Sequence, residues 1–210
     1  MYPRLATLHR MLDRPVSLTG RVLLLPAIAL LLLGGVLPLW RISLVAPQYA
    51  EGLTLDMYAY QIVAGNNGQD LAEINTLNHY IGMRPIAQAD FMEMKVLPFA
   101  IGAFALLGLR AIVVGRIITL VDLAVLFSYF GAFSLGSFAY RLYSYGHHLE
   151  SHAPMKIKPF MPVVIGSQQI ANFVQTSVPL SGTLCMTAFL LLLLAALWSS
   201  IRDARGEATR

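Results

Sequence analysis

The chain is poor in charged residues and in cysteine. Only 12% of its 210 residues are Asp, Glu, Lys or Arg, while 57% are hydrophobic, and the mean hydropathy is +0.64. This balance argues against a soluble domain and indicates an integral membrane protein. The single cysteine, Cys185, leaves no partner for an intramolecular disulfide and argues against a thiolate metal site.

Several catalytic signatures are also missing. The sequence has no Gly-x-Ser-x-Gly, no His-Glu-x-x-His, no glycine-rich phosphate loop and no Cys-x-x-Cys-His haem motif. These absences argue against a hydrolase, a metalloprotease and an ATP-driven pump motor. We therefore expect no catalytic activity from the chain alone.

Long apolar runs are what the chain does have. Four of them approach or exceed the roughly 20 residues that a helix needs to cross the hydrocarbon core. They predict transmembrane helices over residues 22–40, 97–115, 117–140 and 182–201. Trp40, Tyr140 and Trp198 lie near the predicted ends, where amphipathic rings prefer to sit.

The basic residues predict the orientation of these helices. Nine of the fifteen lie before the first span, between spans two and three, or after the fourth, and the two larger loops hold six against seven acids. The positive-inside rule then places residues 1–21, a basic amphipathic lead-in, and the tail 202–210 in the cytoplasm. Loops 41–96 and 141–181 become extracytoplasmic. The predicted fold is an all-α membrane protein with four transmembrane helices, both termini inside and two outer loops. The net charge of +4 follows from this topology, so no nucleic-acid partner is expected.

The first outer loop contains the pattern of one short amphipathic helix, from about 71 to 81. Asp70 and Glu73 form a capping-box pattern at its start, and Gly82 followed by Pro85 ends it. Apolar residues recur at helical spacing between these signals. A second helical run, 86–96, leads into the second span. The second outer loop is rich in proline, which predicts short extended or turn pieces that cap the bundle without forming a domain.

Histidine and methionine gather in these loops, which hold four of the five histidines and six of the nine methionines. Imidazole and thioether groups suit copper better than magnesium or calcium. The candidate ligands are His79, Met83, His147, His148, His152 and Met155, with Met92 and Met94 as further thioether donors. Asn75 and Asn78 are candidate hydrogen-bond partners of those ligands.

Each group also has a simpler interpretation. His79 and Met83 are four residues apart and supply two ligands from one helix end, unless His79 instead hydrogen-bonds a nearby asparagine. Pro154 disfavours helix at the preceding residue, so the spacing of the loop-two histidines need not be helical. Those histidines also suit a pH-sensitive contact. For Met92 and Met94 the favoured interpretation is packing.

Asp122 is the only acid within a predicted span. An intramembrane carboxylate is costly and suggests a function, but a structural ion pair with Arg116 or Arg110 is the favoured interpretation. On the same helix, small residues recur every four positions and predict close helix contact, within the bundle or with another subunit. They are Ser128, Ala132 and Gly136.

The outer-loop motifs resemble a group of small membrane proteins encoded beside nitrous oxide reductase in bacteria. The resemblance covers residues 49–53, 77–83, 145–150 and 153–159, with 166–173 fitting as well. One departure is His148, which stands where that pattern has asparagine. The resemblance implies a partner of a periplasmic copper enzyme, in assembly, copper delivery, or anchoring and electron supply. It implies as candidate residues Asn78, His79, Met83, His147 and Met155.

Together these observations predict an accessory protein of the bacterial inner membrane that binds or presents copper on its extracytoplasmic face for a respiratory copper enzyme. One alternative is a non-catalytic anchor subunit of an oxidoreductase or monooxygenase complex. The other is a haem or quinol site that uses loop histidines. Beyond membrane lipid, we expect a protein partner in the membrane or on its extracytoplasmic side.

Overall fold

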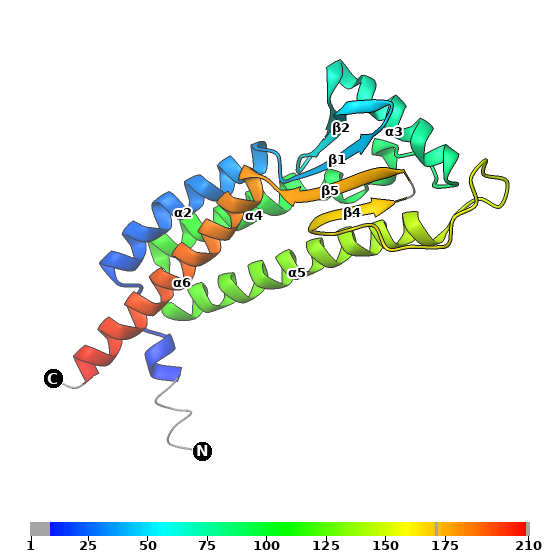
Figure 1. The fold of residues 1–210 in the computed structure, drawn as a ribbon. Helices are drawn as coiled ribbons and strands as arrows, with labels where there is room; N and C mark the ends of the chain where they lie inside the picture. The colour runs from blue at the N-terminus through cyan, green and yellow to red at the C-terminus, as the bar shows by residue number, and fades with distance from the viewer. Residues whose placement is uncertain (1–8, 171, 209–210) are drawn as a thin grey trace. The chain divides into compact units, whose positions relative to one another are not determined.

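A computed structural model describes residues 9–170 and 172–208, and four long helices dominate it (Figure 1). They are α2 (Leu18–Val36), α4 (Glu93–Val114), α5 (Ile117–His147) and α6 (Ser181–Ala208). Each contains a window long and apolar enough to cross a membrane. They lie where the four spans were predicted, although α2 begins and ends earlier and α5 continues beyond residue 140.

The rest of the fold is not helical throughout, so the all-α prediction is wrong. Five strands form one antiparallel sheet with the order β3-β2-β1-β5-β4. The strands are β1 (Trp40–Ala46), β2 (Tyr49–Met57), β3 (Ile62–Ala64), β4 (Gly166–Ile170) and β5 (Phe173–Pro179). The protein therefore has a mixed α/β fold.

The sheet joins the two segments that were predicted to be loops. Ile42 pairs with Leu55 within the first segment and with Ser177 of the second. From Trp40 to Ala46 apolar and polar residues largely alternate, the period of a strand with one buried face. The second segment therefore forms a hairpin of the sheet over 166–179, and the expectation that it only caps the bundle is wrong there.

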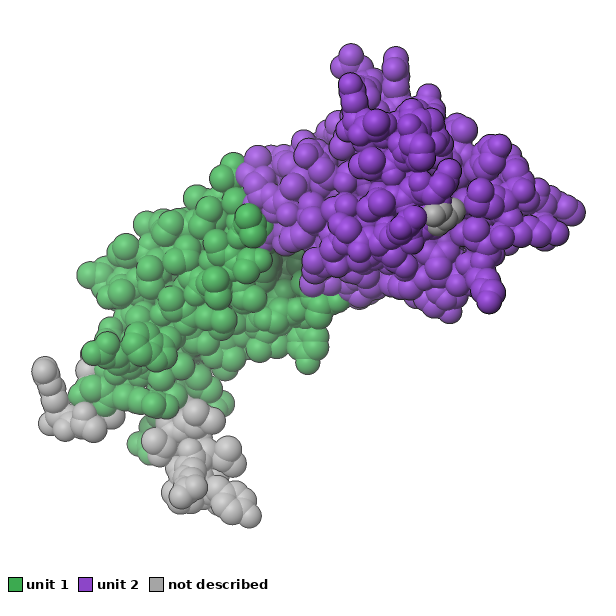
Figure 2. All heavy atoms as spheres, viewed as in Figure 1, with its two compact units in different colours: residues 1–35, 99–132, 184–210 green, residues 36–98, 133–183 purple. Residues whose placement is uncertain are grey.

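The chain divides into two compact units, shown in different colours in Figure 2. The helical unit comprises residues 1–35, 99–132 and 184–210. The α/β unit comprises residues 36–98 and 133–183 and contains the whole sheet. All four long helices contribute residues to both units, α2 and α6 with only one and three residues in the α/β unit.

Close contacts hold the helices of the helical unit together. A Cβ added to Gly20 of α2 would lie 2.6 Å from Ser200 Oγ of α6, and one added to Gly108 of α4 would lie 2.9 Å from Ile28 Cγ1 of α2. Such approaches are typical of membrane helices packed through small residues. Large apolar side chains remain exposed along all four helices, as expected where lipid is the solvent.

The segment before α2 is attached to the turn between α4 and α5. Ile117 N donates to Arg14 O at 2.9 Å, Arg14 Nη1 donates to Ala204 O at 2.7 Å, and Arg116 pairs with Asp13 at 3.3 Å. Of the predicted basic lead-in, residues 1–8 lie outside the described part.

Asp122 does not form the predicted ion pair. Arg116 pairs with Asp13 instead, and within the described residues no basic group lies within ion-pair distance of Asp122. Its side chain is exposed on α5. The small residues predicted to give close helix contact are exposed on the same helix, at Ser128, Ala132 and Gly136.

In the α/β unit, one face of the sheet carries the core. Helix α3 (Gln69–Tyr80) packs there through Ile74 and Leu77 against Leu55 and Phe173. Phe138 of α5 packs against Trp40 of the same face in a tilted arrangement, with ring centroids 5.2 Å apart. Helix α3 and the last turns of α5 therefore cover the same side of the sheet.

The start of α3 is as predicted to within a few residues, but the capping box is not formed. Gly68 is the N-cap, with φ of 94°, and no side chain caps the helix. Glu73 instead accepts a hydrogen bond from the Tyr49 hydroxyl of β2, which raises the pKa of Tyr49 above its usual value.

The predicted second helical run, 86–96, is only a short 3₁₀ turn, η2 (Gln88–Asp90), followed by the first turn of α4. A similar 3₁₀ turn, η1 (Asn66–Gly68), precedes α3.

Candidate functional site

The two histidine- and methionine-bearing segments meet at the end of α3. Glu150 N donates to Gly82 O at 2.8 Å, and Met155 N donates to Tyr80 O at 2.9 Å. These backbone bonds join the chain that follows α5 to the chain that follows α3. The candidate residues of the second segment therefore lie beside those of the first.

Gly82 allows this junction to form. Its φ is +81°, a left-handed conformation that favours glycine at the end of a helix. A Cβ at this position would also lie 3.0 Å from both Ala153 Cβ and Glu150 O. The chain leaves helical geometry here, so the helical i, i+4 alignment predicted for His79 and Met83 is not realised.

Those two residues consequently face different surroundings. The His79 side chain is exposed on the last turn of α3. Met83 is partly buried and lines an inner cavity of the α/β unit. The structure does not make them a ligand pair.

An open depression of about 370 Å³ lies at the junction. Its potential metal ligands are His147, Glu150 and Met155, a nitrogen, an oxygen and a sulfur donor. The other lining residues are Ile81, Leu149, Ser151, Lys156, Ile157 and Pro159. The depression therefore brings together two of the six predicted ligands and adds a carboxylate that was not predicted as one.

The His147 ring is fixed in orientation and in tautomer. Its Nδ1 lies 3.0 Å from Tyr143 O, and because a carbonyl only accepts, Nδ1 carries the proton of the neutral ring. The ring stacks on Tyr143 with centroids 3.8 Å apart. The Nε2 lone pair is thus left for a metal ion or another donor, and a hydrogen bond to the other ring nitrogen is typical of ligating histidines.

The remaining candidates stay outside this depression. His148 is exposed, with Nδ1 3.0 Å from Ser144 O, and His152 is exposed too. Among the described residues, no group of three or more His, Cys, Asp or Glu side chains is close enough to hold a metal ion. His147 and Glu150 do not form such a group, and Met155 is the third side-chain donor available in the depression.

Met92 and Met94 have separate roles. Met94 is buried against Trp40, Met57 and Phe91, as the packing interpretation predicted. Met92 is 62% exposed, so packing is wrong for that side chain. Glu93 between them lies beside Arg141, whose Nη2 donates to both carboxylate oxygens at 2.6 and 2.7 Å.

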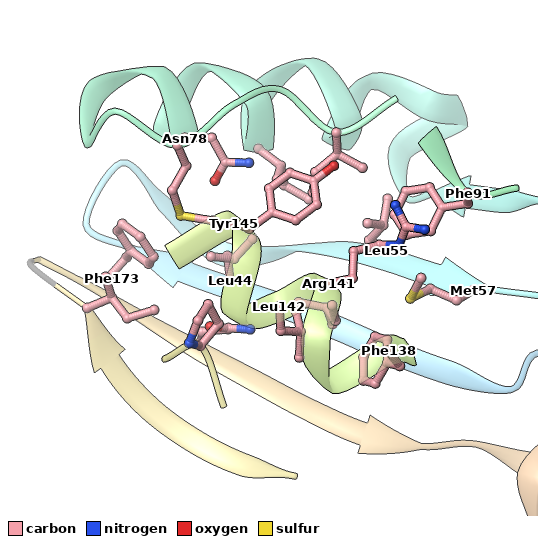
Figure 3. Close-up of a pocket in the computed structure, with 17 residues that line it drawn as sticks. Leu44, Leu55, Met57, Asn78, Phe91, Phe138, Arg141, Leu142, Tyr145 and Phe173 are labelled. Atoms are coloured by element: carbon pink, nitrogen blue, oxygen red, sulfur yellow. The ribbon is translucent and has the colours of Figure 1, made fainter. Parts of the chain in front are cut away.

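The two asparagines support the chain around α3. Asn75 Nδ2 donates to Ile86 O at 3.1 Å, and its Oδ1 accepts from Ile86 N at 2.7 Å, so Asn75 holds the segment after the helix end. Asn78 is buried and lines the same inner cavity as Met83 (Figure 3). Among the described residues, neither asparagine side chain hydrogen-bonds the His79 imidazole, so the bond expected by the simpler interpretation is not formed.

Sequence reasoning missed three side chains around this cavity: Tyr145, Arg141 and Arg84. Tyr145 and Arg141 lie near the end of α5, where a span was predicted to have just ended. The Arg84 guanidinium lies over the Tyr145 ring, 4.4 Å from its centroid. Glu93 and Arg141 carry opposite charges near the ends of two consecutive predicted spans. This signal in the sequence would have identified Arg141.

The chain was also compared with known proteins. No protein-family model, no curated protein and no solved structure matches it.

Proposed function

We propose that this membrane protein binds Cu(I) as cargo in the open depression of its α/β unit and passes it to a partner copper enzyme. The observation that carries the proposal is the placement of His147 and Met155 in one depression. An imidazole and a thioether are soft donors that suit Cu(I). We place the protein in the bacterial inner membrane with this unit on the extracytoplasmic side, following the distribution of its basic residues.

The residues that would hold the ion are His147 through Nε2, Met155 through sulfur and Glu150 through its carboxylate. His147 is pre-oriented by its bond to Tyr143 O, which lowers the cost of binding. The depression is open, so a bound ion stays within reach of a partner. A site with few ligands and open access suits transfer better than permanent storage.

Competition titration of Cu(I) against a chelator tests this assignment in the detergent-purified protein. We expect Met155→Leu and His147→Phe to weaken binding by about tenfold or more each, the change that a loss of ~1.4 kcal/mol produces. His147→Phe keeps a ring to stack on Tyr143, and Met155→Leu keeps the volume.

His79→Ala is the matched control, because His79 is exposed and does not line the depression. Its Cu(I) affinity should equal that of the unmodified protein. Unchanged affinity in a Met155→Leu, His147→Phe double variant that melts normally would contradict the proposed site.

A further inference from the structure

The α/β unit also contains a partly open cavity of about 70 Å³ between the sheet, α3 and the end of α5 (Figure 3). Its lining is mainly apolar and includes Leu44, Leu55 and Phe173 from the strands. Asn78 and Tyr145 are among the few polar residues that line it. This cavity is separate from the depression at the junction, since no residue lines both.

Two polar atoms on this lining are buried without a partner. Within the part of the chain that the structure describes, Asn78 Nδ2 and Tyr145 Oη make no hydrogen bond of normal geometry, although the Arg84 guanidinium lies close to Tyr145. Each of the two residues is only 4% exposed. Figure 3 shows Asn78 on α3 and Tyr145 pointing from α5 toward that helix. Folded proteins rarely leave such groups unsatisfied, because each costs about 1–3 kcal/mol. The pair therefore indicates an occupant.

The one charged residue on the cavity lining already has a partner, so a neutral ligand fits this space best. Arg141 lines the cavity but donates to the Glu93 carboxylate and, at 2.7 Å, to Asp90 O. Arg84 lies over the face of the Tyr145 ring. A charged ligand would meet no unpaired ion on this lining and would lose its hydration in an apolar space.

The volume limits the size of the occupant. At about 70 Å³ it is about half of a ~150 Å³ cavity that binds benzene. Haem and a quinone ring are therefore too large. The apolar lining favours a molecule with a short hydrocarbon part over a pair of waters, which need several polar partners each.

We propose that this cavity binds a small neutral carbonyl compound or alcohol of about four heavy atoms. Its oxygen accepts a hydrogen bond from Asn78 Nδ2 and exchanges one with Tyr145 Oη. Its hydrocarbon part contacts Leu44 and Leu55. This site is independent of the copper proposal, because His147 and Met155 do not line it.

Methionine methyl NMR on the full-length protein in detergent tests this site, with acetone as the probe. Met57 and Met83 line the cavity, whereas Met92 is exposed and serves as an internal control. We expect acetone to shift the Met57 and Met83 resonances saturably and to leave Met92 unchanged. Xenon, which fills apolar space without hydrogen bonds, should shift the same two resonances.

Asn78→Leu and Tyr145→Phe remove one hydrogen-bonding group each and keep the approximate shape. Each should weaken acetone binding about fivefold, with xenon binding retained as the sign of an intact cavity. Acetone affinity that is unchanged in both variants would overturn the proposal. So would the absence of a selective shift of Met57 and Met83 in the unmodified protein.

Discussion

Replacing Asp70 with alanine should destabilise the α/β unit by about 3 kcal/mol, one of the two largest effects that we expect from a single side chain. Asp70 is only 2% exposed, yet it carries a carboxylate. Its Oδ2 accepts from Thr54 N at 2.7 Å, and its Oδ1 accepts from Asn66 Nδ2 at 2.7 Å. Removing the carboxylate leaves both donors without these acceptors.

The position of Asp70 explains why this contact matters. Strand β3 pairs with β2 only as far as Ala64, which lies opposite Leu55. The backbone N–H of Thr54, the residue before Leu55 on β2, donates its hydrogen bond to the Asp70 carboxylate instead of to a strand. Gly65 leaves room for the Asp70 carboxylate, since a Cβ at position 65 would lie 2.3 Å from Asp70 Oδ2. Asp70 thereby connects α3 to the sheet.

The measurement is the apparent melting temperature in detergent, with near-UV circular dichroism as the signal that reports unfolding. Asp56→Ala is the matched control, because Asp56 on β2 forms a partly exposed ion pair with Arg41 at 2.6 Å. Pairs of this kind contribute about 1 kcal/mol or less. Equal losses in the two variants would contradict the role assigned to Asp70.

Gly146→Ala should give the other large effect, a destabilisation of about 2–3 kcal/mol from forced overpacking. A Cβ at this position would lie 2.1 Å from Phe160 O and 2.7 Å from Pro162 Cδ. A backbone hydrogen bond also joins the two segments, since Phe160 N donates to Gly146 O at 3.1 Å. With alanine at position 146, the segment that contains Phe160 and Pro162 would have to move away from α5.

Gly136→Ala gives a control on the same helix with the opposite sign. A Cβ at Gly136 meets no atom within 4 Å, so alanine should stabilise α5 by up to about 1 kcal/mol. Thermal melting of the two variants side by side tests the pair. A Gly146→Ala protein as stable as Gly136→Ala would show that the close approach to Phe160 is not maintained.

The helices were predictable because their signals are local. The apolar run of 22–40 lies close to α2, and the glycine and proline after residue 81 ended α3 nearly where the structure ends it. The sheet was missed for two physical reasons. The alternation from Trp40 to Ala46 directly follows a long apolar run, and the partner of Trp40 on β5, Pro179, is distant in sequence. No local pattern predicts such a pairing.

The candidate site was partly predictable for the same reason. The chemistry of His147 and Met155 is visible in the sequence, and so is their concentration in two segments. Their common depression depends on the bonds from Glu150 to Gly82 and from Met155 to Tyr80, which are tertiary. The spacing of His79 and Met83 predicted a pair that the left-handed Gly82 prevents.

The most direct test of the account is the copper K-edge X-ray absorption spectrum of the Cu(I)-loaded protein. The account predicts a sulfur contribution that disappears in Met155→Leu and persists in Met161→Leu, because Met161 is exposed and does not line the depression. A spectrum without sulfur, or a sulfur contribution that survives in Met155→Leu, would contradict the central claim that the junction of the two segments holds the ion.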